Sequence, residues 1–467
     1  MTRLTFIGGV SEVTGSCHLL ESSAIGKLLL DCGMHQGGDD IKRIKKEAFR
    51  FKPGEIDGVI LSHAHLDHSG LLPKLVHEGF SGPIHCTSAT KELLAILLRD
   101  AQGLYERDLE RENLRLRRAG RRELKAAYGP EDVDQALEQC VGHAYHEHFS
   151  PAPDVQCQFL DAGHILGSAI IQLQVAEGGQ TKTLVFSGDL GNSESALMQD
   201  PEQPARADVV LMESTYGDRD HRPMKSTIEQ LAEILHETWE RRGNVLIPSF
   251  AVERTQELLF HLGLLYDEGR LDNWQVFLDS PMAIHVTRVY DHWIKLLDQT
   301  DIRELKDKHR ASLEKFLPRL SLCETVDDSM SINRVNSGAI IIAGSGMCTG
   351  GRIRHHIKHR IWVQRNSMLF IGFQARGTLG RIIVDGAKQI RLFREQYAVR
   401  AQIETLGGFS AHAGQRALVE WLAGIEGKQR VALVHGEPEA SKVLGAKLWQ
   451  ERQIRTTIPA PGDSLVL

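Results

Sequence analysis

The chain has 467 residues, a length that favours two domains, or one domain with a large insertion, over a single hydrophobic core. Hydrophobic residues make up 42% and charged residues 25%, which excludes a disordered or fibrous protein. The formal net charge of −6 excludes a whole-molecule attraction to nucleic acid, so a polyanion site has to come from local basic patches.

The first residues, "MTRLTFIGGVSEVTG", lack the basic and apolar pattern of a secretory signal, and no stretch has the apolar length of a membrane span. We therefore expect a cytoplasmic protein with no membrane partner. The seven cysteines are scattered and none forms a C-x-x-C pair, which favours reduced, buried thiols over thiolate-bound zinc. Any metal would use histidine and carboxylate ligands.

Short apolar or alternating runs fill the first part of the chain and end at Gly, Asp or His, which is typical of strands and tight turns. A helix is expected over Asp67–Glu78. The charged stretch from Ser88 to Gln139 interrupts the strands, and its piece "RDLERENLRLRRAGRRELK" predicts a solvated helical hairpin. Acids and bases alternate there, so a solvated face is favoured over a nucleic-acid role.

From about residue 218 to 395, strands such as "NVLIPSF" and "WQVFLDS" alternate with helical patterns. This spacing predicts a parallel sheet covered by helices on both faces. After about residue 395, the pattern of short strands and tight turns seen in the first part of the chain returns. We expect one α/β domain inserted into another, with residues 1–217 and 396–467 forming the host and residues 218–395 the insertion.

The stretch "VILSHAHLDHSG" places His63, His65, Asp67 and His68 directly after an apolar strand. Asp67 suits the first turn of a helix, where the helix dipole favours a carboxylate. Ligands gather at such strand ends in α/β sheets. Imidazole and carboxylate donors at this spacing suit Zn²⁺ or a related divalent ion.

Three more donors follow apolar strands beside glycine: His164 in "LDAGHILGSA", Asp189 in "LVFSGDLGN" and His435 in "ALVHGEPEA". Each alone fits a capped turn or a satisfied polar residue. Together with the opening cluster, they favour convergence on one metal centre.

The motifs "LLLDCG", "SHAHLDHSG", "AGHILGS" and "FSGDLG" resemble, in order, those of the metallo-β-lactamase superfamily. "LMESTYGDRDH", "FSAHAG" and "VALVHGE" resemble the extra motifs of its β-CASP group, the nucleases typified by the cleavage-and-polyadenylation endonuclease subunit and its prokaryotic relatives. The resemblance spans nearly the whole chain. It implies an α/β fold in which a metallo-β-lactamase αββα sandwich carries an inserted α/β β-CASP domain.

The resemblance also implies two Zn²⁺ ions per chain and a role for each motif residue. One ion would be held by His63, His65 and His164, and the other by Asp67, His68 and His435, with Asp189 bridging them. Asp31 would orient a ligand histidine, and Glu213 would pair with His412 beside the scissile phosphate.

Two neighbouring divalent ions suit hydrolysis of a phosphodiester, because they lower the pKa of water and neutralise charge on the phosphoryl oxygens. The leaving ribose oxygen needs a proton, for which His412, kept protonated by Glu213, is the expected donor. Taken alone, His412 fits a structural turn residue equally well. The function expected is a zinc-dependent ribonuclease, endonucleolytic and possibly also 5′ exonucleolytic, that acts in RNA processing or decay.

A histidine at position 435 resembles the RNA-acting members of the group. The run "GGRIRHHIKHRIWVQR" holds basic residues without an acid, which fits phosphate tracking or, equally, a solvated helix face. The "AGSGMCTGG" segment before it suits a phosphate at a helix start. The expected contacts to single-stranded RNA are Ser249, Arg254, Ser345, Gly346, Arg352 and Arg376.

Three alternatives stay open at this point: a small-molecule metallo-hydrolase of the same superfamily, a DNA nuclease of the β-CASP group, and a scaffold protein with a vestigial site. Intact candidate ligands argue against the scaffold. The sequence leaves open the metal, which manganese fits too, the RNA specificity, the pathway and a homodimer.

Overall fold

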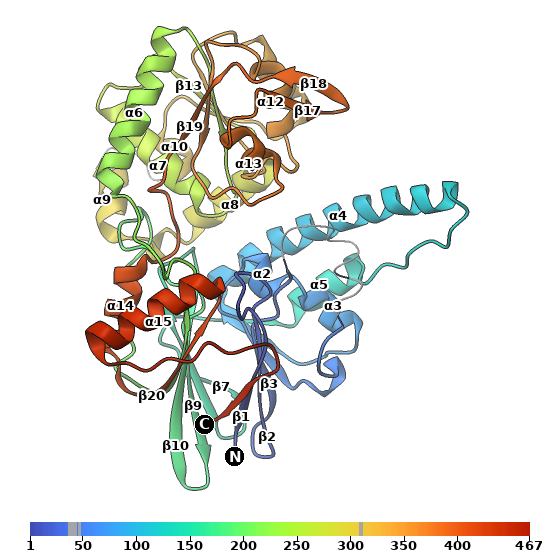
Figure 1. Ribbon diagram of the computed structural model, residues 1–467, viewed down its shortest axis with the longest axis vertical. Helices are drawn as coiled ribbons and strands as arrows, with labels where there is room; N and C mark the ends of the chain where they lie inside the picture. Colours follow the sequence, from blue (N-terminus) through green and yellow to red (C-terminus); the bar gives the residue numbers. More distant parts are fainter. Residues whose placement is uncertain (36–43, 45–47, 308–311) are drawn as a thin grey trace. The chain divides into compact units, whose positions relative to one another are not determined.

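The computed structural model describes residues 1–35, 44, 48–307 and 312–467. The chain divides into two compact units (Figure 1). The host unit comprises Met1–Ser193, Gln199–Asp220 and His412–Leu467. The inserted unit comprises Glu194–Met198 and His221–Ala411.

Two mixed sheets form the centre of the host unit. The first has seven strands, in the order β21 (Ser464–Val466), β1 (Arg3–Gly8), β2 (Cys17–Ser22), β3 (Gly26–Leu30), β4 (Gly58–Ile60), β5 (Ile84–Thr87) and β6 (Cys140–His143). The second has six, in the order β20 (Glu426–Val434), β11 (Arg206–Glu213), β10 (Gln180–Phe186), β9 (Ala169–Glu177), β8 (Val155–Asp161) and β7 (Phe149–Ala152).

The two sheets pack face to face through alternating apolar side chains. Leu4 and Phe6 of β1 belong to the same core as Phe159 of β8 and Phe186 of β10. The residues between them in each strand point to the other face, because side chains alternate along a strand. This inter-sheet core is the centre of the sandwich.

Helices cover the outer faces of both host sheets. The apolar sides of α14 (Gln415–Gly424) and α15 (Pro438–Arg452) join a core with the second sheet. On the first sheet, α4 (Ser88–Arg118) contacts β5 and β6, and α5 (Pro130–Glu138) packs on α4 and α3 (Leu72–His77). The host unit therefore has the expected αββα layers.

The segment after β4 contains two short helices where the sequence predicts one. Helix α2 (Leu66–Ser69) ends before Gly70, and α3 begins at Leu72 with Pro73 in its first turn. Proline is favoured in the first turn of a helix and lacks the amide that a continuing helix would need. The expected helix over Asp67–Glu78 is therefore interrupted, and α2 alone carries two of the predicted ligands.

The charged stretch forms a hairpin with only one long helical arm. Helix α4 is 31 residues long, and the chain returns from Gly120 to Gly129 without regular structure before α5 (Figure 1). Gly120 has φ +64°, a left-handed conformation that favours glycine at the end of a helix. The prediction of a solvated helical hairpin is confirmed for α4 and wrong for residues 120–129, which form no helix.

The inserted unit is built on a parallel sheet with helices on both sides, as expected. Its six strands run in the order β14 (Leu320–Leu322), β13 (Gln275–Leu278), β15 (Ala339–Ala343), β12 (Val245–Pro248), β16 (Ser367–Phe370) and β19 (Gln402–Thr405). All neighbouring pairs are parallel. A hairpin of β17 (Gln389–Leu392) and β18 (Glu395–Ala398) lies outside this sheet.

Alternation along β12 shows how the two faces are covered. Val245 and Ile247 pack with α6 (Met224–Glu240), α7 (Arg254–Asp267) and α8 (Pro281–His292), whereas Leu246 packs with α12 (Ile353–Arg360) and α13 (Leu379–Val384). Further helices of the described residues are η1 (Pro53–Glu55), η2 (Ile294–Leu296), α9 (Gln299–Asp307), α10 (Leu313–Phe316), α11 (Val326–Ser331) and η3 (Ile332–Arg334).

The described units and the sequence-based boundaries divide the chain differently near residue 400. The sequence pattern places residues 396–411 in the host, but they include β19, which pairs with β16 at the edge of the inserted sheet. The host unit resumes at His412, which forms a β-bridge with Gly191.

All seven cysteines are free and buried. Among the helices of the described residues, none combines the length and the apolar character needed to cross a bilayer.

Candidate metal centre

The loop that follows β4 brings the opening cluster of donors to one end of the host sandwich. The backbone of this loop is fixed by hydrogen bonds from Ser16 N to Asp67 O (2.8 Å) and from Cys32 N to His68 O (2.8 Å). A Cβ at Gly33 would lie 1.6 Å from the Asp67 carbonyl oxygen, so this close approach requires glycine. His63 and His68 are fully buried.

The first donor set consists of three histidines and one carboxylate oxygen. His65 Nδ1 lies 3.1 Å from His63 Nε2 and 3.2 Å from His164 Nε2. Both Nε2 atoms lie 3.6 Å from Oδ2 of Asp189. One ligand atom from each of the four residues falls within 4.8 Å of all the others, a grouping that suits a single metal ion.

The second donor set contains Asp67, His68 and His435, whose ligand atoms also lie within 4.8 Å of one another. His435 Nε2 is 3.7 Å from Asp67 Oδ2. Oδ1 of Asp189 is 3.3 Å from His68 Nε2 and 3.1 Å from His435 Nδ1. The two oxygens of Asp189 thus face different sets.

Unsatisfied polar atoms show that these residues fit a bound cation. His68 Nε2, His435 Nε2 and Asp189 Oδ1 are buried and make no hydrogen bond with any described residue. Leaving such atoms unpaired in a protein interior costs about 1–3 kcal/mol each. A divalent ion satisfies nitrogen and carboxylate lone pairs at once, which hydrogen bonds between these groups do not do here.

Asp31 contacts Nδ1 of His68, the ring nitrogen opposite the one that lies near Asp189. Its Oδ2 lies 2.6 Å from His68 Nδ1 and accepts hydrogen bonds from the hydroxyls of Ser16 (3.1 Å) and Ser62 (3.0 Å), and its Oδ1 accepts from Ser62 N. Asp31 has φ +59°, a strained conformation for a non-glycine residue. A carboxylate in this position fixes the ring so that Nε2 faces the site.

The pKa shifts keep His63, His65, Asp67 and Asp189 in ligand form. His68 differs, because burial opposes its protonation but the charges of Asp189 and Asp31 outweigh burial and raise its pKa. Burial, followed by the charge of His68, lowers the pKa of His63, and burial lowers the pKa of His65 to about 4. Burial alone would raise the pKa of Asp67, but the nearby imidazoles of His435, His68 and His65 outweigh it and lower the pKa to about 2. Burial likewise opposes ionisation of Asp189, and the charges of His435 and His68 outweigh it. At neutral pH, His63 and His65 are neutral and the carboxylates are ionised.

Glu213 and His412 form the predicted pair next to the first donor set. His412 Nδ1 lies 3.2 Å from Glu213 Oε1, and the His412 ring is 4.5 Å from that of His164. Glu213 is fully buried at the end of β11, and its Oε1 also accepts from Leu190 N at 2.6 Å. The side chain of His412 is 20% exposed, so its ring has access to solvent and to a bound molecule.

The predicted RNA contacts lie in the inserted unit, and two of its loops bring four of them near one end of the sheet. Ser249 follows β12 and Ser345 follows β15, the neighbouring strand. A Cβ at Gly346 would lie 2.6 Å from the Phe250 ring, so the two loops touch. Arg254 begins α7 and pairs with Glu253 at 3.5 Å. Ligands bind at such strand ends in parallel sheets.

Arg352 and Arg376 have different surroundings. The Arg352 guanidinium bonds to Asp279 (2.7 Å) and to the carbonyl oxygens of Cys323 and Glu324 (2.8 Å each), whereas Arg376 is exposed. Arg360, from the same basic run as Arg352, is buried against Ile332 O. The run is therefore not one continuous basic face.

Sequence reasoning missed the residues that support the donors. Ser16 and Ser62 bond to Asp31, and the Thr215 hydroxyl lies 3.3 Å from His435 Nδ1. Burial, with the charges of His68 and His435, lowers the pKa of His18 to about 3, and neither of its ring nitrogens bonds to a described residue. Only the position of Ser62 next to His63 carried any signal in the sequence.

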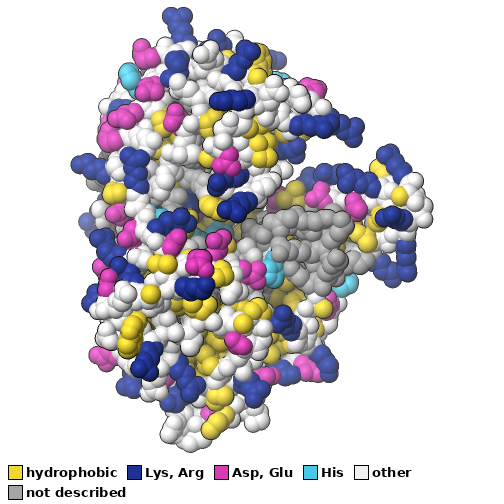
Figure 2. Space-filling model, in the orientation of Figure 1, with side chains coloured by type: hydrophobic (Ala, Val, Ile, Leu, Met, Phe, Trp, Pro, Cys, Tyr) yellow, Lys and Arg dark blue, Asp and Glu magenta, His cyan; other side chains and the backbone are white. Residues whose placement is uncertain are grey.

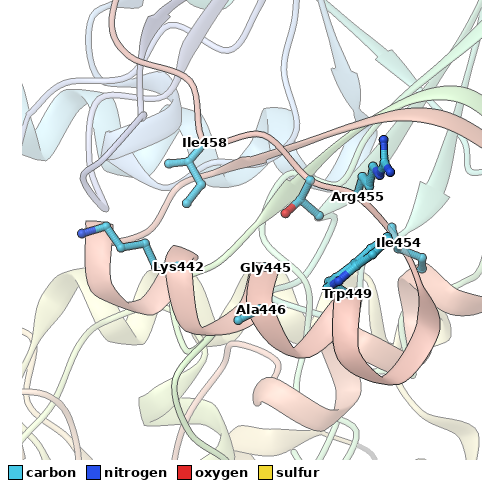
Figure 3. A pocket seen from close by; sticks show the side chains of 8 residues that line it. Lys442, Gly445, Ala446, Trp449, Ile454, Arg455 and Ile458 are labelled. Carbon is cyan, nitrogen blue, oxygen red and sulfur yellow. The ribbon is translucent and has the colours of Figure 1, made fainter.

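Figure 3 shows a shallow hollow on the host unit, beside α15. It is lined by Lys442, Gly445, Ala446, Trp449, Ile454, Arg455, Thr456 and Ile458. None of the candidate metal ligands lines it, so this hollow is separate from the donor sets.

Three family models match the chain. The model of the metallo-beta-lactamase superfamily matches residues 10–168, the Beta-Casp domain matches residues 255–383, and the Zn-dependent metallo-hydrolase RNA specificity domain matches residues 396–459. The first and third contain the candidate metal ligands except Asp189, and the third also contains His412.

Curated relatives match over nearly the whole chain. "Ribonuclease TTHA0252" of Thermus thermophilus is 41% identical over 96% of this chain and 96% of its own length. An "RNase J-like protein" of Methanocaldococcus jannaschii is 31% identical, with all of both chains covered. A "Transcription termination factor FttA" of Methanothermobacter thermautotrophicus is 31% identical over 98% of this chain and 70% of its own length.

A solved structure of a protein of unknown function from Enterococcus faecalis has a TM-score of 0.58 at 13% identity, covers both chains completely, and supports the fold alone. The donor sets, the three family models and the full-length relatives agree. The chain belongs to the β-CASP group of the metallo-β-lactamase superfamily.

Proposed function

We propose that this protein is a zinc-dependent ribonuclease that hydrolyses phosphodiester bonds of RNA. The observation that carries the proposal is the pair of buried donor sets that share Asp189, in a chain that matches the RNA specificity model. Relatives named as a ribonuclease and an RNase J-like protein support the same activity.

The donors fit two ions. His63, His65 and His164 would hold one, Asp67, His68 and His435 the other, and Asp189 both. Bound ions of this kind stabilise negative charge on phosphoryl oxygens and make water more acidic. Asp31 and Thr215 keep the rings of His68 and His435 in position.

His412 is the proposed proton donor to the leaving ribose oxygen. It is the partly exposed histidine beside the first donor set, and buried Glu213 at 3.2 Å favours its protonated form. General acid catalysis by a positioned histidine contributes about 10²–10⁴ in rate.

The substrate contacts proposed in the inserted unit are Ser249, Arg254, Ser345, Gly346 and Arg376, without the Arg352 that the sequence also suggested. Arg376 is exposed and suits a phosphate. Because Arg352 already bonds to Asp279 and two carbonyl oxygens, we assign it the ordering of the loop before α12. We further propose single-stranded RNA as the substrate, the cytoplasm as the site of action, and endonucleolytic cleavage.

The proposal is tested by incubating purified protein of known metal content with a 5′-labelled single-stranded RNA and its DNA counterpart. Internal cleavage of RNA, with DNA spared and the Asp67→Ala variant inactive, is the expected result. Cleavage of DNA at an equal rate would favour a DNA nuclease of the group. If metal-loaded protein cut neither, a small-molecule hydrolase or a scaffold would replace the proposal.

A further inference from the structure

An arm extends from the body of the host unit. It comprises the second half of α4, from Leu104 to Arg118, and the return segment that ends at Gly129 (Figure 1). The buried residues of α4 end at Leu109, so the outer turns of the helix contribute nothing to a core. Core packing therefore does not explain the outer end of the arm.

Specific contacts nevertheless order the arm. Asn113 accepts a hydrogen bond from Leu124 N (2.8 Å) and donates one to Leu124 O (3.0 Å). The Tyr105 hydroxyl accepts from Ala127 N at 2.8 Å, and the Tyr105 and Tyr128 rings stack with centroids 5.0 Å apart. These contacts fasten the return segment to the helix and present its outer end as a defined surface.

Positive charge is concentrated at that outer end. Within Arg115–Lys125 the cations are Arg115, Arg117, Arg118, Arg121, Arg122 and Lys125, and Glu123 is the single acid. Figure 2 shows basic side chains gathered over the end of the arm. The formal net charge of the whole chain is −6, so this cluster has the opposite sign to the molecule.

Ion pairs do not neutralise the cluster. Arg111 and Arg115, nearer the body, pair with Asp108 and Glu112, and Arg117 pairs with Glu123. Arg118, Arg121, Arg122 and Lys125 are exposed and make no ion pair within the described chain. The alternation of acids and bases that favoured a solvated face holds only for the inner part of the arm. Exposed like charges held close together repel one another, and a polyanion relieves that repulsion.

We propose that the outer end of the arm, Arg118, Arg121, Arg122 and Lys125, binds the sugar–phosphate backbone of RNA outside the segment being cleaved. Guanidinium groups suit phosphate oxygens. Both aromatic rings of the arm are buried, so they offer bases no stacking surface, and the binding is independent of sequence. The surface extends the substrate contacts of the proposed ribonuclease and rests on that function.

The test compares two variants with the same change in charge. The arm variant carries Arg118→Gln, Arg121→Gln, Arg122→Gln and Lys125→Gln. The control variant carries Arg3→Gln, Arg206→Gln, Arg416→Gln and Arg452→Gln, which are exposed cations elsewhere on the host unit. Both are made in a His412→Ala background, so that the RNA persists while its binding is measured by fluorescence anisotropy.

For a single-stranded RNA of about 40 nucleotides, the arm variant should bind about tenfold more weakly than the control. The slope of log affinity against log salt concentration should be smaller in magnitude by up to about 3, because four phosphate contacts are lost. An RNA of about 8 nucleotides, too short to fill the metal centre and the arm together, should bind both variants equally.

Equal affinities of the two variants for the long RNA would overturn the inference. So would displacement of the long RNA by polyglutamate as effectively as by unlabelled RNA, because the arm would then bind an acidic polypeptide as well as it binds RNA. Neither result affects cleavage by the protein without these substitutions, so failure of the arm proposal is distinguishable from failure of the proposed ribonuclease activity.

Discussion

Asp189 joins the two donor sets, because its oxygens face His63 and His164 on one side and His68 and His435 on the other. We predict that Asp189→Ala loses both metal ions and lowers RNA cleavage more than about 100-fold, while the protein stays folded. Metal content by atomic emission, together with circular dichroism, checks this. The surface change Asp134→Ala is the control, and two retained equivalents of metal would contradict the shared role of Asp189.

The His412 prediction separates proton donation from metal binding. His412→Ala should keep its metal but cleave RNA about 10²–10⁴-fold more slowly. A phosphodiester with a nitrophenolate leaving group needs little protonation, so the variant should lose much less activity on that substrate. An equal loss on both substrates would show that His412 does not supply the proton.

Asp161 gives a pH prediction for stability. Burial raises its pKa from 3.8 to about 7, with a smaller contribution from Glu202, although a hydrogen bond from Gly163 N opposes the shift. The folded state therefore binds a proton that the unfolded state releases, so the free energy of unfolding falls as the pH rises from about 4 to about 7.

Asp161→Asn stays neutral and keeps the acceptor for Gly163 N. We predict that it flattens this decline, measured by urea unfolding at about pH 5 and about pH 8. The exposed change Asp134→Asn should leave the wild-type slope unaltered. If the free energy of unfolding fell with pH as steeply in Asp161→Asn as in the wild type, a group other than Asp161 would cause the decline.

At the residue scale, local motifs pointed to the candidate donors and to the Glu213–His412 pair, because most of these residues follow a strand within a short motif that contains glycine. The residues that orient them were not predictable. Ser16 reaches Asp31 only because β2 and β3 pair, and Thr215 reaches His435 only because β11 and β20 pair. Such contacts depend on tertiary pairing, which one sequence does not reveal.

At the element scale, periodicity predicted the inserted sheet and its helices, since buried parallel strands and amphipathic helices have distinct patterns. The prediction of helices failed where it depended on composition rather than on a periodic pattern. Pro73 divides the helix expected over Asp67–Glu78, and the return of the arm is irregular although its composition suits a helix.

The arm also gives an element-scale prediction. Asn113→Ala removes both hydrogen bonds to Leu124, so the return segment should separate from α4. Hydrogen exchange should accelerate between residues 119 and 127, and the melting temperature should hardly change, because the outer arm is not part of a core. Leu114→Ala, which truncates an exposed neighbour, is the control. Unchanged exchange in Asn113→Ala would mean that other contacts hold the arm.

At the scale of the whole molecule, the sequence predicted an interrupted host, and the structure describes two units with separate cores. The boundaries near residues 218 and 396 stay predictions, and β19 shows why the second is hard to predict. Its strand pattern fits either unit, and only its pairing with β16 assigns it to the inserted sheet.

We propose that the buried donor sets bind the metal that drives RNA hydrolysis. Titration of Zn²⁺ into chelator-treated protein, with RNA cleavage and bound metal followed together, tests this role. We predict no cleavage without metal and a rate that reaches its plateau at two equivalents per chain. Cleavage by metal-free protein, or no cleavage when both donor sets are filled, would contradict this role of the donor sets.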